Sequence, residues 1–125
     1  MAQQVKSGIR ITGIDLHAYL VKDAKRAIAF YRDVLGLVPD EESEVGAEFT
    51  LADGSTFGVW DPQGAMPWEK GTGVMFAVED VDASVAFARS KGAKFGDVIE
   101  TPVCRMSVGE DSEGNQVILH ERKAG

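Results

Sequence analysis

The sequence lacks the features that place a protein in a membrane or an oxidising compartment. Its 125 residues include a single cysteine, Cys104, so no disulfide can form within the chain. No apolar run approaches the roughly 18 residues that a membrane-spanning helix needs. The first ten residues, "MAQQVKSGIR", carry no apolar stretch after the lysine and do not resemble a secretory signal. We therefore expect a cytoplasmic protein without a membrane partner.

Basic clusters and phosphate-binding motifs are also missing. Thirteen lysines and arginines stand against 20 acidic residues, which gives a formal net charge of −7. An acidic surface repels phosphate backbones, so we expect no nucleic-acid partner. The glycine-rich loops GxGxxG and GxxxxGK[ST] do not occur, and neither does the nucleophile motif GxSxG. The acidic run "DEESE" at 40–44 is interpreted as a solvated loop.

The first half of the chain has an ordered set of secondary-structure signals. "IRITGIDLHAYLV" is rich in β-branched and aromatic residues and predicts a strand. Asp23 stands where an N-cap belongs, and "AKRAIAFYRDVLG" has apolar residues at helical spacing up to a stop at Gly36. "AEFTLADGSTFGVW" holds two short apolar runs joined through Asp53 and Gly54, which indicates a hairpin.

The second half repeats this order. "GVMFAVED" predicts a strand, Asp80 a cap, "VDASVAFARSKG" a helix, and "FGDVIETPVCRMSVGE" with "QVILHER" the following strands. The caps Asp23 and Asp80 lie 57 residues apart, and the turn glycines Gly54 and Gly114 lie 60 apart.

Each half therefore predicts one β-α-β-β-β module. The boundaries are about 9–61 for the first module and about 73–122 for the second, with a Pro/Gly-rich surface connector at 61–72. The expectation is one α+β domain made of two tandem modules.

Three of these stretches resemble a known family. "VKDAKRAIAFYRDVLGL" is similar to the opening motif of the vicinal oxygen chelate superfamily, which includes glyoxalase I, extradiol dioxygenases and bleomycin-resistance proteins. "FAVEDVDASVAFARSKGAKF" is similar to the matching motif of the second module. "EDSEGNQVILHE" resembles the "DPDGNxIEL" ending, with Ser112 in place of the usual proline. The likeness runs from about Ile11 to Arg122.

The resemblance implies an architecture and an assembly. Each module forms a curved sheet with its helix on the outside, and the two sheets close around a central pocket. Many two-module members of the family pair, so a homodimer is expected.

The resemblance also locates four metal-ligand positions, on the first and last strands of each module. One lies seven residues before the capping Asp and the other four residues after the turn glycine. In this sequence the four are Leu16, Gly58, Gly73 and Ile118. None has a side-chain donor, whereas a divalent metal needs nitrogen, oxygen or sulfur ligands. We therefore expect no metal site of the family type and no cofactor.

The same register predicts the residues that line the pocket. They are Leu16, Ala18, Gly58, Trp60, Gly73, Met75, Ile118 and His120. Trp60 would give a flat apolar wall, and His120 a group that titrates near neutrality and is the candidate acid/base. His120 could also end a surface strand. Arg105 could bind a ligand carboxylate, or it could pair with acids at a sheet edge.

Two further residues are assigned with alternatives. His17 falls on the helix-facing side of its strand with Tyr19, which favours a partly buried residue with Asp15 as a candidate partner; a ligand or base role is the alternative. Trp68 in the connector suggests a lid over the pocket or a dimer contact.

The expected function is metal-free binding of a small, partly aromatic molecule, by a protein of the glyoxalase/bleomycin-resistance type. One alternative is a metal-dependent glyoxalase-like lyase or dioxygenase that uses His17, His120 and an acid. Others are a metal-free enzyme with His120 as acid/base, and a protein that sequesters an antibiotic. Whether the protein is an enzyme is left open.

Overall fold

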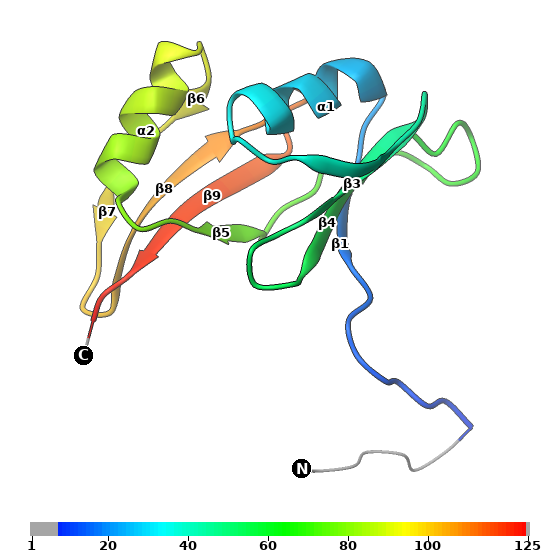
Figure 1. Ribbon diagram of the computed structural model, residues 1–125, viewed down its shortest axis with the longest axis horizontal. Helices are drawn as coiled ribbons and strands as arrows, with labels where there is room; N and C mark the ends of the chain where they lie inside the picture. The colour runs from blue at the N-terminus through cyan, green and yellow to red at the C-terminus, as the bar shows by residue number, and fades with distance from the viewer. Residues whose placement is uncertain (1–7, 125) are drawn as a thin grey trace.

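The computed structural model describes residues 8–124 and shows two repeated modules (Figure 1). The elements of the first are β1 (His17–Leu20), α1 (Ala24–Asp33), β2 (Pro39–Glu42), β3 (Gly46–Thr50) and β4 (Thr56–Trp60). The elements of the second are β5 (Met75–Ala77), α2 (Val81–Ser90), β6 (Lys94–Phe95), β7 (Ile99–Glu100), β8 (Cys104–Glu110) and β9 (Gln116–Arg122).

Each module has one mixed sheet with the same topology. The first sheet has the order β1-β4-β3-β2, and the second has β5-β9-β8-β6 with β7 also paired to β8. The first strand of each module runs parallel to the last, from which it is separated in sequence by a helix and the intervening strands, and the remaining pairs are antiparallel. The predicted α+β class is confirmed, and neither sheet closes into a barrel.

Both helices begin and end where the sequence indicates. The Asp23 carboxylate accepts a hydrogen bond from the Arg26 backbone N–H at 3.1 Å, and Asp80 accepts one from Ala83 at 3.0 Å. Gly36 follows α1 with a φ of +75°, a conformation that a side chain disfavours. Neither helix is long and apolar enough to cross a membrane, within residues 8–124.

The apolar core continues from one module into the other. The Tyr31 ring on α1 lies 4.9 Å from the Phe57 ring on β4, and Phe57 lies 5.1 Å from Phe76 on β5. All three are buried in one cluster. Burying such an aromatic side chain stabilises the fold by about 1.5–3 kcal/mol.

The turn between β8 and β9 joins the modules through hydrogen bonds. The buried Asp111 carboxylate accepts from the Tyr31 hydroxyl at 2.8 Å, and Glu113 accepts from the Asp23 backbone N–H at 2.6 Å. Asn115 donates to the Leu20 carbonyl at 3.2 Å. Burial, followed by the nearby Asp111 charge, raises the pKa of the Tyr31 phenol far above its ordinary range, so it remains a donor.

The first strand is shorter than the sequence predicts. β1 begins at His17 because its partner β4 begins at Thr56, and residues 8–16 extend beyond the end of the sheet (Figure 1). His17 pairs with Phe57 on the helix-facing side, as its spacing from Tyr19 predicts. It is exposed, however, so the expectation of a partly buried residue is wrong. Its place at the end of the sheet explains the exposure.

Candidate functional site

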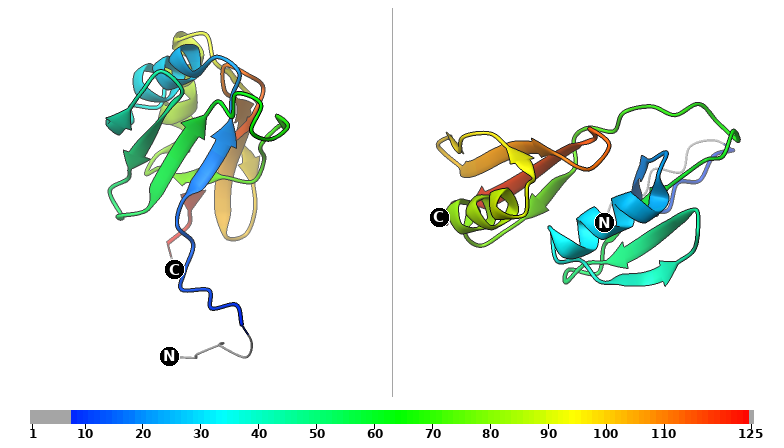
Figure 2. Two further views of the ribbon diagram at one scale, coloured as in Figure 1. Left: turned by 90° about the vertical axis from the view of Figure 1, so that its right-hand side faces the viewer. Right: turned by 90° about the horizontal axis from the view of Figure 1, so that it is seen from above.

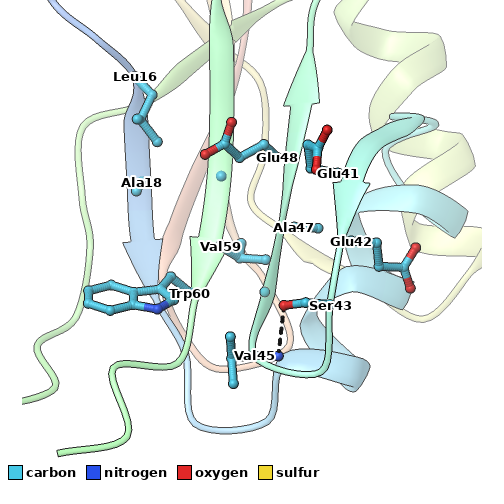
Figure 3. A pocket seen from close by; sticks show the side chains of 12 residues that line it. Leu16, Ala18, Glu41, Glu42, Ser43, Val45, Ala47, Glu48, Val59 and Trp60 are labelled. Carbon is cyan, nitrogen blue, oxygen red and sulfur yellow. Dashed lines mark hydrogen bonds between the residues drawn. The ribbon is translucent and has the colours of Figure 1, made fainter. Parts of the chain in front are cut away.

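The first sheet packs one face against α1 (Figure 2). A cavity of about 270 Å³ lies on the face that points away from α1 (Figure 3). We call it the first-sheet cavity. Four strands contribute to it because alternate residues of a strand share one face. Its lining residues are Leu16, Ala18, Glu41, Glu42, Ser43, Val45, Gly46, Ala47, Glu48, Gly58, Val59 and Trp60. Four of the eight predicted pocket residues therefore meet here.

The floor of this cavity depends on a missing side chain. Gly58 lies at the centre of β4, beside Ala18 on β1 and Glu48 on β3. A Cβ at this position would lie 3.2 Å from the Ala47 carbonyl oxygen and 3.4 Å from Leu16 Cδ1. Gly58 and Leu16 are thus close together, as the family register requires of two ligand positions. Neither offers a donor atom, so this pair does not fit a divalent metal.

Trp60 forms the apolar wall. It ends β4 and pairs with Gly46, which has no side chain on the cavity face. Trp60 keeps 40% of its surface exposed, and Figure 3 shows its ring beside Ala18. A large exposed aromatic ring next to a concave surface is typical of a site that stacks a flat ligand.

Trp68 does not form a lid over this cavity. Its indole N–H donates to the Leu20 carbonyl at 3.0 Å, and the Lys22 ammonium lies 4.6 Å from its ring. It is part-buried against its own chain. This placement anchors the connector to the end of β1.

Two carboxylates at one end of the cavity were not singled out from the sequence. Glu41 on β2 is paired with Glu48 on β3, so the two lie directly opposite on the cavity face (Figure 3). Neither forms an ion pair with another residue of 8–124. Like charges in this arrangement are destabilising. The run "DEESE" was expected to be a loop, but its first residues form β2. The alternation of apolar and polar residues at Ala47, Glu48 and Phe49 was the sequence signal that could have placed Glu48 on the outward face of a strand.

The remaining predicted residues lie on a different surface. Met75 pairs with Ile118, and Ala77 with His120, on the face of the second sheet that points away from α2; we call these four the second-sheet face. None of them lines the first-sheet cavity. Met75 is 53% exposed and Ile118 only 6%. Gly73 precedes β5 with a φ of +93°. The structure therefore does not bring the two predicted groups into one cavity within the chain.

Arg105 lies on the opposite side of β8 from the second-sheet face. It pairs across the strands with Glu121, while its neighbour Met106 pairs with His120. Its guanidinium contacts Asp82 at 2.8 Å and Glu100 at 3.0 Å. The hydrogen bond from Arg105 lowers the pKa of Asp82. This arrangement secures the first turn of α2, as the edge-paired alternative predicted, and does not present Arg105 to the residues around His120.

The donor atoms of the described part of the chain offer no evident metal centre. No group of three or more His, Cys, Asp or Glu residues within 8–124 is arranged to hold an ion. Gly73 and Ile118, the second pair of family ligand positions, have no donor either. His17 and His120 lie in different modules and on opposite faces of their sheets.

Comparison with known proteins identifies the fold. Residues 13–119 match the family described as Glyoxalase/Bleomycin resistance protein/Dioxygenase superfamily. A lactoylglutathione lyase from Agrobacterium tumefaciens is similar in structure, with a TM-score of 0.74 at 22% identity over 89% of this chain and 94% of that one.

Two proteins from Streptomyces sp. CB03234 are also similar. TnmS3, an antibiotic binding protein, has a TM-score of 0.74 at 23% identity over 92% of this chain and 99% of its own. A glyoxalase/bleomycin resistance protein has a TM-score of 0.69 at 25% identity over 83% and 96%. The curated proteins contain no match.

Proposed function

Because the chain belongs to the glyoxalase/bleomycin resistance protein/dioxygenase superfamily, we propose that it binds a small, partly aromatic organic molecule in the first-sheet cavity without a metal. The observation that carries this proposal is the cavity itself. Gly58 and Leu16 stand at two positions where the resemblance implies metal ligands, and they leave open space without a donor atom beside the exposed Trp60 ring. The fold occurs in a lyase and in an antibiotic binding protein, so the absence of a donor at Gly58 and Leu16 is what favours binding over metal chemistry.

The proposal includes a second copy of the chain. The first-sheet cavity is open on one side, and the second-sheet face presents Met75 without a covering element. We propose a homodimer in which the cavity of one copy faces the second-sheet face of the other. Each closed pocket would then hold Trp60 from one copy and His120 from its partner copy. Two such pockets form by two-fold symmetry.

The charges on the two faces support this pairing. Glu41 and Glu48 give the first-sheet cavity two uncompensated negative charges. On the second sheet, the positively charged Arg122 lies two residues beyond His120 on β9 and therefore on the same face. Opposite charges across an interface favour the correct encounter and register. The apolar Trp60 and Met75 would supply the buried contact.

A fluorescence titration tests the binding proposal. The probe is N-phenyl-1-naphthylamine, an uncharged aromatic amine whose emission rises in an apolar cavity. Trp60→Ala removes the stacking wall, so the dissociation constant should rise about tenfold, which corresponds to 1.4 kcal/mol. Phe87→Ala is the matched control, because Phe87 is an exposed aromatic residue on α2 outside the cavity. Equal affinities in the two variants would contradict the proposal.

Metal analysis tests the proposal that the protein binds its ligand without a metal. The purified protein should hold no stoichiometric zinc, nickel, manganese or iron, and probe binding should not change after treatment with a chelator. A stoichiometric metal that is lost in His17→Ala or His120→Ala would instead support the metal-dependent lyase or dioxygenase.

A further inference from the structure

A second cavity lies between the modules, away from the first-sheet cavity. It has a volume of about 270 Å³ and is bounded by α1, by the turn between α2 and β6, and by the turn between β8 and β9. It shares no residue with the first-sheet cavity. Its lining residues are Arg26, Phe30, Val34, Lys91, Gly92, Ala93, Lys94, Glu110, Asp111, Ser112 and Gly114. We call it the inter-module cavity.

Three cations line this cavity without a direct ion pair, although the Lys91 charge also acts on the Asp33 carboxylate. Arg26, Lys91 and Lys94 form no ion pair with any carboxylate of residues 8–124. The Lys91 ammonium lies 5.5 Å from the Phe87 ring, a weak contact at an exposed site. In a chain with a formal net charge of −7, this group of unpaired cations is opposite in sign to the rest of the molecule.

The two acids of the cavity offset part of this positive charge but not all of it. Asp111 is buried, and its carboxylate already accepts hydrogen bonds from Tyr31, Asn115 and the Glu113 backbone N–H. Glu110 is exposed and pairs across the strands with Lys94, with no ion pair between them. Three cations against two carboxylates leave the lining of the cavity with a net charge of +1.

Ser112 adds two hydrogen-bond donors at the same place. The family ending has a proline here, and proline has no backbone N–H. Ser112 brings both a backbone N–H and a hydroxyl, and neither donates to another residue of 8–124. Its Oγ is buried, and a buried polar atom without a partner is uncommon and calls for an explanation.

We propose that the inter-module cavity binds a small oxyanion of the phosphate type. Arg26, Lys91 and Lys94 would provide the charge, and Arg26 can contact two oxygens at once through its planar guanidinium. The Ser112 N–H would donate to a third oxygen, and its hydroxyl would follow by rotation about χ1. The volume of the cavity is several times the roughly 30 Å³ that one water molecule occupies, so a phosphate group fits. The site would be independent of the first-sheet cavity.

Nuclear magnetic resonance of the full chain tests this site. Sodium phosphate is titrated at constant ionic strength, with sodium chloride as the replaced salt, and amide shifts are followed. The result expected is saturable shifts at Ser112, Gly114 and Lys94. Acetate, with fewer acceptor oxygens and less charge, should bind at least several-fold more weakly. Scattered, non-saturating shifts at lysines throughout the chain would overturn the proposal, because they indicate screening alone.

Variants decide which groups hold the anion. Ser112→Pro restores the family residue and removes both donors, so the phosphate dissociation constant should rise about tenfold or more. Lys25→Gln is the control, because Lys25 is an exposed cation on α1 outside the cavity and its loss should change affinity about twofold at most.

If Ser112→Pro does not fold, the pair Ser112→Ala and Lys94→Gln takes its place, and each should weaken binding. Unchanged affinity in the folded Ser112 and Lys94 variants would overturn the assignment.

Discussion

The two modules share one topology but differ at matching positions of their outward faces. Gly58 in β4 corresponds to Ile118 in β9, and Trp60 corresponds to His120, each pair 60 residues apart. The glycine leaves a cavity floor in the first module, whereas Ile118 fills the same place in the second. One module therefore supplies the hollow and the aromatic wall, and the other supplies an apolar surface with a titratable group. Neither face alone is a complete pocket.

The two helices also differ at a matching position, where one carries a large residue and the other a small one. Tyr31 on α1 is large, and the residue 57 positions later, Ala88 on α2, is small. Tyr31 fills the junction between the modules and reaches Asp111 of the second module. The repeat thus provides a common frame, and the departures from it determine where the modules join and where a ligand fits.

The largest expected effect concerns this junction. Tyr31→Ala should lower the free energy of unfolding by about 3–5 kcal/mol, because it empties a buried aromatic site and leaves Asp111 without a donor. Tyr31→Phe removes the hydroxyl alone and should cost about 1–3 kcal/mol. Urea unfolding measures both. Ala88→Gly, the matching position in α2, should cost only about 1 kcal/mol. A Tyr31→Ala loss no larger than that would show that the junction does not depend on Tyr31.

The next effect concerns the cavity floor. Gly58→Ile gives the first module the second module's filled face, so binding of the fluorescent probe should fall by more than tenfold. The tight approach to the Ala47 carbonyl should also cost about 1–3 kcal/mol of stability. Gly13→Ala is the control, because Gly13 lies outside the cavity, has no positive φ and would meet no atom within 4 Å of the added Cβ, so it should retain probe binding. Full probe affinity in Gly58→Ile would place the ligand elsewhere.

The smallest effect concerns Arg105. Its hydrogen bond lowers the pKa of Asp82, so the stabilisation from this pair is complete above the ordinary pKa of 3.8 and is lost as the pH falls through the lowered value in the folded state. Arg105→Met should therefore be less stable than the wild type near neutral pH and approach it in acid. Urea unfolding between neutral and acidic pH measures the difference. The opposite trend would mean that Asp82 does not ionise against Arg105.

The sequence predicts most of the frame, because its signals are local. The caps at Asp23 and Asp80 and the stop at Gly36 depend on a few neighbouring residues, and all three were found in place. The structure also brings Leu16 next to Gly58, whereas a one-residue shift of the strand would turn every side chain to the other face.

Other features depend on contacts between distant segments. The end of β1 follows from where β4 begins, which the repeated pattern does not specify. The partners of Arg105 come from α2, β7 and β9 and so cannot be read from its own strand. How the two outward faces lie relative to each other depends on the junction around Tyr31 and Asp111. The family resemblance implied a pocket between the two sheets, but local sequence patterns do not specify this junction.

The most direct test of the central proposal is subunit complementation. Trp60→Ala damages the first-sheet cavity, and Met75→Asp damages the second-sheet face, so each pure variant should bind the fluorescent probe weakly. In a mixed dimer, one pocket combines the intact Trp60 of one copy with the intact Met75 of the other. Purified mixed dimers should therefore recover wild-type affinity at half the wild-type stoichiometry. Mixed dimers that bind no better than the two pure variants would contradict a pocket shared between copies.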